Sequence, residues 1–323
     1  MWVNLVIMQS LELEYPISHG KRQRHSLPQV LAIGEFDGVH LGHQEVIKHA
    51  VNAAAGLGLP SSVMTFHPHP REVLGQCKYV QLLTPLAEKE RLLGGLGVDN
   101  MYIVSFNREL MTVTPEQFVE NMLLPMNVNT VVVGFDFRFG YQGAGTPDTL
   151  CELSRERFTV EVIRPFHRNG SKVSSTLVRE HLLAGRVVEA NALLGRPYVL
   201  RGRVVTGEGR GRTIGFPTAN IELSEPFIVP ALGVYAVRVT VGGHTHHGVM
   251  NIGKKPTFFA DLSQPTLEVH IFDFSESIYG NLVSLELISY LRPERKFASV
   301  DELIAQIGED AESAKALLAA PSN

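Results

Sequence analysis

Cysteine is scarce in this sequence: there are two in 323 residues, Cys77 and Cys151, and they lie far apart. Neither belongs to a metal-ligand spacing, so we expect no disulfide framework and no zinc site, and a reducing cytoplasm fits this cysteine usage. An excess of basic residues is also absent. With a net charge of -4 and 19% charged residues, the composition disfavours nucleic acid as a partner. The sequence has no internal repeat and no low-complexity tract.

Long apolar runs are missing as well. Residues 1–8 are apolar but few, lack a basic leader and are followed by Glu12 and Glu14. This pattern predicts a first β-strand rather than a signal peptide or a membrane span. We therefore expect a cytoplasmic protein with no membrane partner. The length is sufficient for two domains, each with a core of its own.

Residues 1–185 alternate short apolar runs with helix-like stretches. The apolar runs, each about as long as a strand buried on both faces, are 30–33, 62–66, 101–106, 130–135 and 159–163. Between them, Thr84 and Pro85 predict a capping residue followed by a proline at the first helical position, and residues 114–117 form a capping box. This alternation predicts an α/β domain with a mostly parallel, doubly wound sheet.

The sequence pattern changes after residue 194. A helical connector over 176–194, interrupted at Gly185, leads into strand-like segments separated by Gly, Pro and Asn rather than by helices. These segments are 198–205, 233–241, 245–252, 266–274 and 282–291, with a hairpin turn expected at Gly242 and Gly243. They predict a small antiparallel β-barrel or sandwich, and an amphipathic helix over 300–318 is expected to pack across it.

The stretch GEFDGVHLGH, residues 34–43, follows the first buried strand directly. There, glycines let the backbone approach a ligand, and the next helix offers N–H groups to an anion. His40 and His43, three residues apart, would point the same way and stabilise charge on a phosphoryl group, which favours nucleotidyl transfer. A plain strand-loop-helix turn explains the same spacing. So does a metal pair with Asp37 as third ligand, although the Glu of a zincin helix is missing.

A second cluster of polar residues opens the predicted connector helix. Ser174, Ser175 and Thr176 could cap it and donate to phosphates, while Arg179 supplies a bidentate positive group. An N-cap cluster without a ligand is the alternative interpretation.

The second half carries a glycine-rich loop, GEGRGRTIG, at residues 207–215. Its backbone could wrap phosphates, but the Walker pattern is absent, and a flexible surface hairpin is the alternative. Thr218 and Asn220 alternate on an extended segment, so both oxygens could face one Mg²⁺ ion.

Glu268 lies in one of the predicted strands of the second half. Period-two alternation over residues 266–271 puts Glu268 and His270 on the face opposite the apolar side chains, which also fits a solvated strand face. His244, His246 and His247 follow the Gly-Gly turn and fit an exposed hairpin tip better than a metal site.

Taken in order, these motifs resemble the prokaryotic bifunctional riboflavin kinase/FMN adenylyltransferase (FAD synthetase) family. The resemblance covers nearly the whole chain. Its segments are 34–43, 65–70 (TFHPHP), 134–140 (GFDFRFG), 174–179, 194–197 (LGRP), 215–220 (GFPTAN), 251–253, 256–257 and 267–270. The resemblance implies an FMN adenylyltransferase domain of the HxGH nucleotidyltransferase type over 1–185 and a riboflavin kinase barrel over 186–323.

The resemblance also implies roles for individual residues. His40 and His43 would hold the ATP phosphates and stabilise the transition state, Glu268 would be the kinase base, and Thr218 and Asn220 would hold Mg²⁺ with ATP. The other implied ATP-binding residues are Gly34, Phe36, Asp37, Gly38, Ser174, Ser175, Thr176, Arg179, Gly211, Arg212 and Gly215. The implied flavin-binding residues are Phe66, Pro68, His69, Pro70, Asp136, Phe137, Arg292, Glu294 and Phe297.

Two positions depart from the family pattern. Glu35 stands where Asn or a small residue is common, and Thr146 stands where an acidic residue is frequent, with Asp148 nearby. These departures bear on flavin affinity rather than on the type of reaction.

The expected partners are riboflavin, FMN, FAD, ATP, ADP and pyrophosphate, with a monomer or a weak homo-oligomer as the assembly. Since the FMN phosphate is already anionic at neutral pH, adenylyl transfer needs positioning and charge stabilisation but no general base. Two other functions fit part of the sequence: a different HxGH nucleotidyltransferase, such as a cytidylyltransferase or an aminoacyl-tRNA synthetase-like protein, and a flavin-sensing or RNA-binding regulator that keeps the pockets without turnover.

Overall fold

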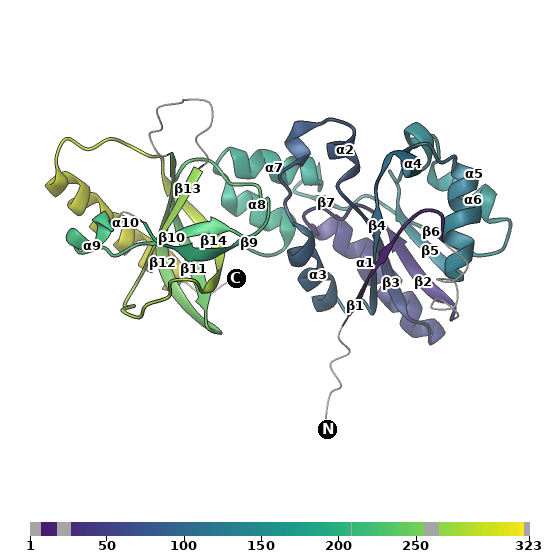
Figure 1. The fold of residues 1–323 in the computed structure, drawn as a ribbon, viewed down its shortest axis with the longest axis horizontal. Coiled ribbons are helices and arrows are strands. Elements are labelled where there is room, and N and C mark those ends of the chain that lie inside the picture. Colours follow the sequence, from purple (N-terminus) through teal and green to yellow (C-terminus); the bar gives the residue numbers. More distant parts are fainter. Residues whose placement is uncertain (1–7, 18–26, 208, 255–264, 320–323) are drawn as a thin grey trace, which may run out of the picture. The chain divides into compact units, whose positions relative to one another are not determined.

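The computed structural model describes residues 8–17, 27–207, 209–254 and 265–319 (Figure 1). Contacts divide the chain into two compact units, one up to Ser174 and one from Ser175 onward. Residues 1–7 of the predicted first strand lie outside the described residues, and Met8 is not in a strand.

A six-stranded parallel sheet forms the first unit, in the order β1-β4-β3-β2-β5-β6. The strands are β1 (Gln9–Leu13), β2 (Gln29–Ile33), β3 (Ser61–His67), β4 (Asn100–Ser105), β5 (Val128–Gly134) and β6 (Thr159–Ile163). A two-stranded ribbon, β7 (His167–Arg168) and β8 (Ser171–Lys172), follows. The parallel α/β sheet predicted from the sequence is confirmed.

Helices cover both faces of this sheet. They are α1 (Leu41–Leu57), α2 (Pro70–Val73), α3 (Leu86–Gly95), α4 (Arg108–Met111), α5 (Pro115–Phe118) and α6 (Pro147–Ser154), with the shorter η2 (Cys77–Tyr79), η3 (Val119–Leu123), η4 (Leu124–Met126) and η5 (Tyr141–Gly143). Alternate residues of β2 belong to two different hydrophobic clusters. Val30 and Ala32 pack with residues of α1 and α3. Leu31 and Ile33 pack with residues of α4, α5 and η3. This is why the strands read as continuous apolar runs.

One predicted helix start is right and another is wrong. Thr114 and Gln117 form the predicted capping box at α5. In contrast, α3 begins at Leu86 with Pro85 at the N-cap position, so Thr84 does not cap it. The Thr84 hydroxyl accepts the Gly38 N–H instead.

A closed six-stranded barrel forms most of the second unit, in the order β10-β13-β12-β11-β14-β9. Its strands are β9 (Tyr198–Val205), β10 (Ala219–Leu223), β11 (Gly233–Val241), β12 (His244–Lys254), β13 (Pro265–Ile271) and β14 (Leu282–Arg292), and its helices are α7 (Ser175–Leu183), α8 (Val187–Leu194), α9 (Arg210–Thr213) and α10 (Val300–Ala319). The break between α7 and α8 falls at Gly185, as predicted. The antiparallel barrel is confirmed.

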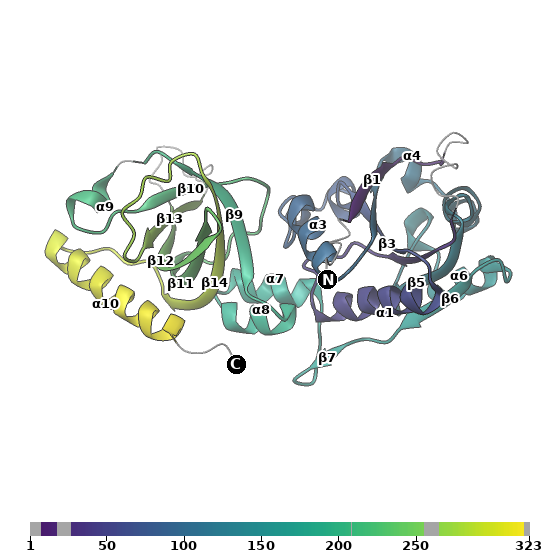
Figure 2. The same cartoon turned by 90° about the horizontal axis from the view of Figure 1, so that it is seen from below.

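The helix α10 packs on the outer wall of the barrel (Figure 2). Along β13 the buried side chains Leu267, Val269 and Ile271 alternate with the half-buried Glu268 and His270. In a small barrel the buried set fills the interior, so the alternate set lies on the outer wall. Outer residues such as Ala236 and Val249 form a core cluster with Ala311 and Ala314 of α10. The helix therefore covers part of the outer wall of the barrel.

Two further observations concern the chain as a whole. Cys77 and Cys151 are both free and exposed. Within the described ranges, none of the helices has the length and apolar character needed to cross a membrane.

Candidate functional site

The two histidines of the 34–43 motif lie side by side at the start of α1. His40 is the N-cap residue, and its Nδ1 accepts the N–H of His43 over 3.2 Å. The two rings stack with their centroids 3.6 Å apart. Because Nδ1 is an acceptor, a neutral His40 carries its proton on Nε2 and can donate from that atom. His40 therefore caps the helix and supplies a donor beside the helix N-terminus, where an anion is favoured.

The loop that precedes these histidines has a strained backbone. Phe36, Gly38 and Val39 all have positive φ, at +48°, +96° and +40°. A β-branched residue such as Val39 rarely adopts this conformation. At Gly34, a Cβ would lie 3.0 Å from the buried Phe36 ring, so glycine leaves room for that ring. Strain of this kind persists where surrounding contacts fix it and is concentrated at ligand sites.

Thr84 and Asp37 fix this loop. The Asp37 Oδ1 accepts the N–H of Thr84 over 3.0 Å, and the Thr84 hydroxyl accepts the N–H of Gly38 over 2.8 Å. Both side chains are buried, at 3% and 2% exposure. Asp37 therefore holds the loop in shape. In the part of the chain that the structure describes, no group of three or more His, Cys, Asp or Glu side chains could hold a metal ion.

Lys89 of α3 makes a second set of contacts to the loop. Its Nζ donates to the Glu35 carbonyl over 2.7 Å and to the Thr65 hydroxyl over 3.0 Å. Oε2 of Glu35 is buried and has no hydrogen-bond partner among the described residues. Burial raises the pKa of the Glu35 carboxyl to about 8, and burial lowers the pKa of the Lys89 ammonium. A buried amine thus ties β3 and α3 to the strained loop.

The predicted flavin-binding segment 66–70 lies next to the same loop. His69 caps α2 by accepting the N–H of Arg71 at its Nδ1, its ring stacks on Tyr79 at 4.6 Å, and Pro70 is the first residue of the helix. A cavity of about 10 Å³ lies where the segments converge, enough for one water. Its lining residues are Asp37, Phe66, His67, His69, Leu82, Leu86 and Lys89. Predicted ATP-side and flavin-side residues therefore meet here.

The other predicted flavin segment follows β5. The Lys172 ammonium, on β8, donates to the Asp136 Oδ2 over 2.6 Å and lies 4.3 Å from the centroid of the Phe135 ring. Phe137 stacks on Phe139 with a centroid distance of 5.5 Å. Farther along the chain, Thr146 caps α6 by accepting the N–H of Thr149, which gives this departure from the family pattern a structural role.

The predicted phosphate clamp begins α7. The helix starts at Ser175, as the Ser-Ser-Thr cluster predicts, and Arg179 is 7% exposed. Since α7 belongs to the second unit and the histidine motif to the first, their convergence on one ATP molecule stays a prediction.

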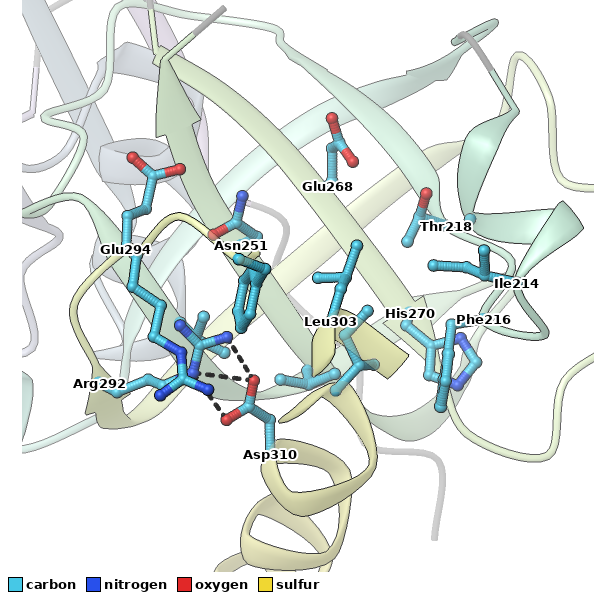
Figure 3. A pocket seen from close by; sticks show the side chains of 16 residues that line it. Ile214, Phe216, Thr218, Asn251, Glu268, His270, Arg292, Glu294, Leu303 and Asp310 are labelled. Carbon is cyan, nitrogen blue, oxygen red and sulfur yellow. Dashed lines mark hydrogen bonds and ion pairs between the residues drawn. The ribbon is translucent and has the colours of Figure 1, made fainter. Parts of the chain in front are cut away.

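A cavity of about 270 Å³ lies on the outer wall of the barrel, under α10 (Figure 3). This volume is close to the lower end of the range for small-molecule sites. Six of the predicted residues line it, namely Gly211, Thr218, Glu268, Arg292, Glu294 and Phe297. In Figure 3, Thr218 and Arg292 lie on opposite sides of the cavity, and Glu268 lies between them.

The register of the strands brings the polar lining together. Glu268 of β13 lies opposite Asn220 of β10 on one side and opposite Asn251 of β12 on the other. Asn251 in turn lies opposite Val234 of β11, which lies opposite Arg292 of β14. Residues directly opposite one another place their side chains on the same face, with Cβ atoms about 4.5–5.5 Å apart. Five strands therefore contribute to one row on the outer wall.

The glycine-rich loop packs closely on the predicted metal ligands. A Cβ at Gly207 would lie 2.0 Å from the Asn220 side-chain nitrogen, and one at Gly211 would lie 2.3 Å from the Phe216 carbonyl oxygen and 3.2 Å from the Thr218 hydroxyl. Glycine at these two positions is needed for close approach. His270 adds a further contact, because its Nδ1 lies 2.8 Å from the Pro217 carbonyl oxygen.

Known proteins match both units. The FAD synthetase family matches residues 22–177, and the riboflavin kinase family matches residues 194–318. The chain is 42% identical over 313 residues to the bifunctional riboflavin kinase/FMN adenylyltransferase of Listeria monocytogenes, covering 97% of this chain and 99% of that protein. The chain belongs to this bifunctional family. Another member, from Bacillus subtilis, is 41% identical over 309 residues, covering 95% of this chain and 97% of that protein.

A solved structure has the same fold as this family member. It is described as the macrolide-efflux protein from Streptococcus pneumoniae, and it superposes with a TM-score of 0.85 at 34% identity, covering 95% of this chain and 99% of that one. The likeness extends over both units.

Some predicted residues of this family member lie apart from the barrel cavity. Arg212 and Gly215 are exposed and do not line it, and the Asn220 side chain lies under Gly207 beside it. His246 packs edge-to-face on Phe274, whereas His244 and His247 are exposed on the predicted hairpin.

The sequence reasoning also missed several residues. In the barrel cavity these are Ile214, Phe216, Val234, Val249, Asn251, His270, Arg295, Leu303, Ile307 and Asp310. In the first unit, Thr84, Lys89 and Lys172 were not singled out as site residues. Asn251 lies in a segment that carries the family resemblance and could have been found from it. Asp310 and Lys89 have no local signal, since each is a charged residue in an ordinary amphipathic helix.

Proposed function

We propose that the protein makes flavin cofactors in two steps, phosphorylating riboflavin to FMN and then transferring the adenylyl group of ATP to FMN, which gives FAD and pyrophosphate. The observation that carries this proposal is the match to both halves of one bifunctional family, with 42% identity over 97% of the chain. We assign the adenylyl transfer to residues 1–185 and the kinase reaction to residues 186–323.

In the kinase step, the terminal ribityl hydroxyl of riboflavin attacks the γ-phosphorus of ATP, the bond to the bridging oxygen breaks and ADP leaves. Glu268 takes the hydroxyl proton. Its place between Thr218 and Arg292 in the cavity supports this role, because a base is needed where the flavin tail meets the phosphates. Arg292, Glu294 and Phe297 lie on the flavin side.

Thr218 and Asn220 are the proposed residues for Mg²⁺. A hydroxyl and an amide oxygen, two residues apart on an extended segment, are ligands of the kind that a hard cation takes. The close approach of Gly207 and Gly211 to these two side chains supports a crowded, fixed geometry at this point. Bound there with ATP, Mg²⁺ would supply positive charge beside the phosphates.

In the adenylyl transfer, a phosphate oxygen of FMN attacks the α-phosphorus of ATP, and pyrophosphate leaves. His40 and His43 donate hydrogen bonds to the phosphates as charge develops. The stacked rings at the N-terminus of α1 support this assignment. Ser174, Ser175, Thr176 and Arg179 are proposed to hold the triphosphate, and Phe66, Pro68, His69, Pro70, Asp136 and Phe137 are proposed to bind the flavin.

A product assay tests the two-step function. The purified protein is incubated with riboflavin, ATP and Mg²⁺, the flavins are separated by chromatography over time, and the assay is repeated starting from FMN. We expect FMN and then FAD from riboflavin, and FAD alone from FMN. A protein that binds flavin to saturation but yields neither product would be the flavin-sensing regulator instead.

Single substitutions test the assignment of the sites. His43→Ala removes one donor to the developing charge and is expected to lower FAD formation from FMN by about 10²- to 10³-fold while leaving FMN formation intact. Glu268→Ala is expected to abolish FMN formation and to spare FAD formation from added FMN. Each activity is followed separately in each variant.

Matched controls are available for both substitutions. His49→Ala changes an exposed histidine of α1, and Glu276→Ala changes an exposed carboxylate near β13. Both controls are expected to retain both activities. Equal loss of the two activities in His43→Ala or in Glu268→Ala would refute the assignment of two separate sites.

The sequence supports a cytoplasmic location and a monomer or weak homo-oligomer, which remain predictions. Fractionation of cells and light scattering of the purified protein would test them.

A further inference from the structure

Asp310 of α10 is buried at the edge of the barrel cavity and accepts hydrogen bonds from two nitrogens of Arg292. Nε of Arg292 donates to both carboxylate oxygens over 2.9 and 3.0 Å, and Nη2 donates to Oδ2 over 2.7 Å. Gln306, one turn earlier in α10, donates to Oδ1 over 3.0 Å. Asp310 is 6% exposed and lines the cavity (Figure 3). A buried carboxylate with this many donors is a fixed anchor, because charge-assisted bidentate pairs are strong and directional.

The pairing fixes the plane of the Arg292 guanidinium. A third nitrogen, Nη1, donates to the Pro293 carbonyl over 3.0 Å, so all three nitrogens are engaged. A guanidinium has five N–H groups. One N–H on Nη1 and one on Nη2 are not used in these contacts and can bind a ligand. Cζ of Arg292 also lies 5.7 Å from the Phe297 ring centroid.

The part of the cavity formed by Arg292, Asp310 and the apolar side chains of α10 suits an uncharged, planar ring system. Asp310 neutralises Arg292, so this pair supplies hydrogen-bond donors without net charge. Apolar side chains of α10, Leu303 and Ile307, line the cavity beside the pair. The isoalloxazine ring of riboflavin is flat, largely apolar and edged with carbonyl oxygens, which matches donors set in an apolar wall.

We propose that Asp310 is the positioning residue of the riboflavin site: it holds Arg292 in the orientation that receives the flavin ring, and through it α10 forms part of the substrate site. This inference rests on the proposed kinase function of the barrel. It adds to that function a residue of the C-terminal helix that does not itself take part in phosphoryl transfer.

The test is Asp310→Asn in the full-length protein, with the riboflavin and ATP dependence of FMN formation measured separately. Asparagine has nearly the same shape, but its amide N–H groups face the donors of Arg292 and displace that side chain. We expect the KM for riboflavin to rise about tenfold or more, while kcat and the KM for ATP stay within about threefold. Asp310→Glu, which keeps the charge, is expected to recover part of the loss.

A double variant separates positioning through Arg292 from a direct role. If Asp310 acts through Arg292, then Arg292→Ala and the combination of Arg292→Ala with Asp310→Asn have the same KM for riboflavin. Glu309→Gln, which removes the neighbouring exposed carboxylate of α10, is the matched control and is expected to leave both kinetic constants unchanged.

Three results would overturn the proposal. They are an unchanged KM for riboflavin in Asp310→Asn, multiplied effects in the double variant, and a barrel that no longer unfolds cooperatively in Asp310→Asn, which would make Asp310 a folding residue. FAD formation from added FMN shows that the other unit is intact in each variant. If the unsubstituted protein formed no FMN at all, the kinase function itself would fail, which is a separate result.

Discussion

Several side chains in the first unit have a structural partner as well as a proposed role toward substrate. Asp37 accepts the Thr84 N–H and His40 caps α1, so the strained loop and the helix N-terminus depend on the same residues that are expected at the ATP phosphates. A substitution at such a position changes both the shape of the loop and its contact with a ligand. The kinetic effect of such a substitution is best compared with the effect of changing a residue that contacts the loop but is not expected to contact ATP.

Glu35 provides a pH test at the residue scale. Its carboxyl ionises near pH 4.5 in the unfolded chain, whereas burial raises its pKa to about 8 in the folded protein. Between these values the unfolded chain loses the proton first, so this group lowers the free energy of unfolding as the pH rises from about 4.5 to about 8. Glu35→Gln removes the titration. We expect the variant to lose less stability than the parent protein over this pH range, measured as the unfolding midpoint of the first unit.

Glu45→Gln is the control for that experiment, since Glu45 is exposed on α1. The same slope of stability against pH in Glu35→Gln and in the parent protein would contradict the buried, proton-retaining carboxyl.

At the scale of elements, each site depends on a helix that has no catalytic motif. Lys89 of α3 and Thr84, which precedes that helix, hold the histidine loop, and α10 holds Arg292 through Asp310. Irregular pairing of strand β14 also helps to position a site residue. The register with β11 shifts twice near its end, which brings Arg292 opposite Val234. β-bulges of this kind redirect side chains near functional sites.

Thr84→Val tests the role of the segment that precedes α3. Valine matches the shape of threonine but removes the buried hydroxyl that accepts the Gly38 N–H. Losing this bond is expected to cost the first unit about 1–3 kcal/mol in the free energy of unfolding. We also expect a higher KM for ATP in FAD formation, with FMN formation unchanged. Thr84→Ser keeps the hydroxyl and is expected to behave like the parent protein; equal defects in both variants would show that the methyl group, rather than the hydroxyl, matters.

At the scale of the whole molecule, the two units have cores of their own. Residues of the sheet form two clusters with the helices of the first unit, and α10 forms a separate cluster with the barrel. We expect two unfolding transitions in calorimetry. Riboflavin at about 100 times its Kd is expected to stabilise the barrel by about 2.7 kcal/mol and to raise the midpoint of one transition. An equal rise of both midpoints would contradict this expectation.

Local patterns were sufficient to predict most elements of this fold. Apolar runs such as 30–33 and 62–66 coincide with β2 and β3 to within one residue at each end, because strands buried on both faces need continuous apolar side chains. The capping box at Thr114 was correct because its contacts span only four residues. The cap expected at Thr84 was wrong, since a distant partner, Gly38, takes its hydroxyl.

The two domain types, the histidine motif, the glycine-rich loop and the candidate base could all be predicted from patterns in the sequence, because each pattern involves residues close together in the chain. Which side chains share a site follows from the tertiary structure. Glu268, Asn251 and Arg292 meet through strand register and two register shifts in β14, and Asp310 and Lys89 reach their partners from helices far along the chain. Such contacts depend on the packing of whole elements, which no local pattern in the sequence encodes.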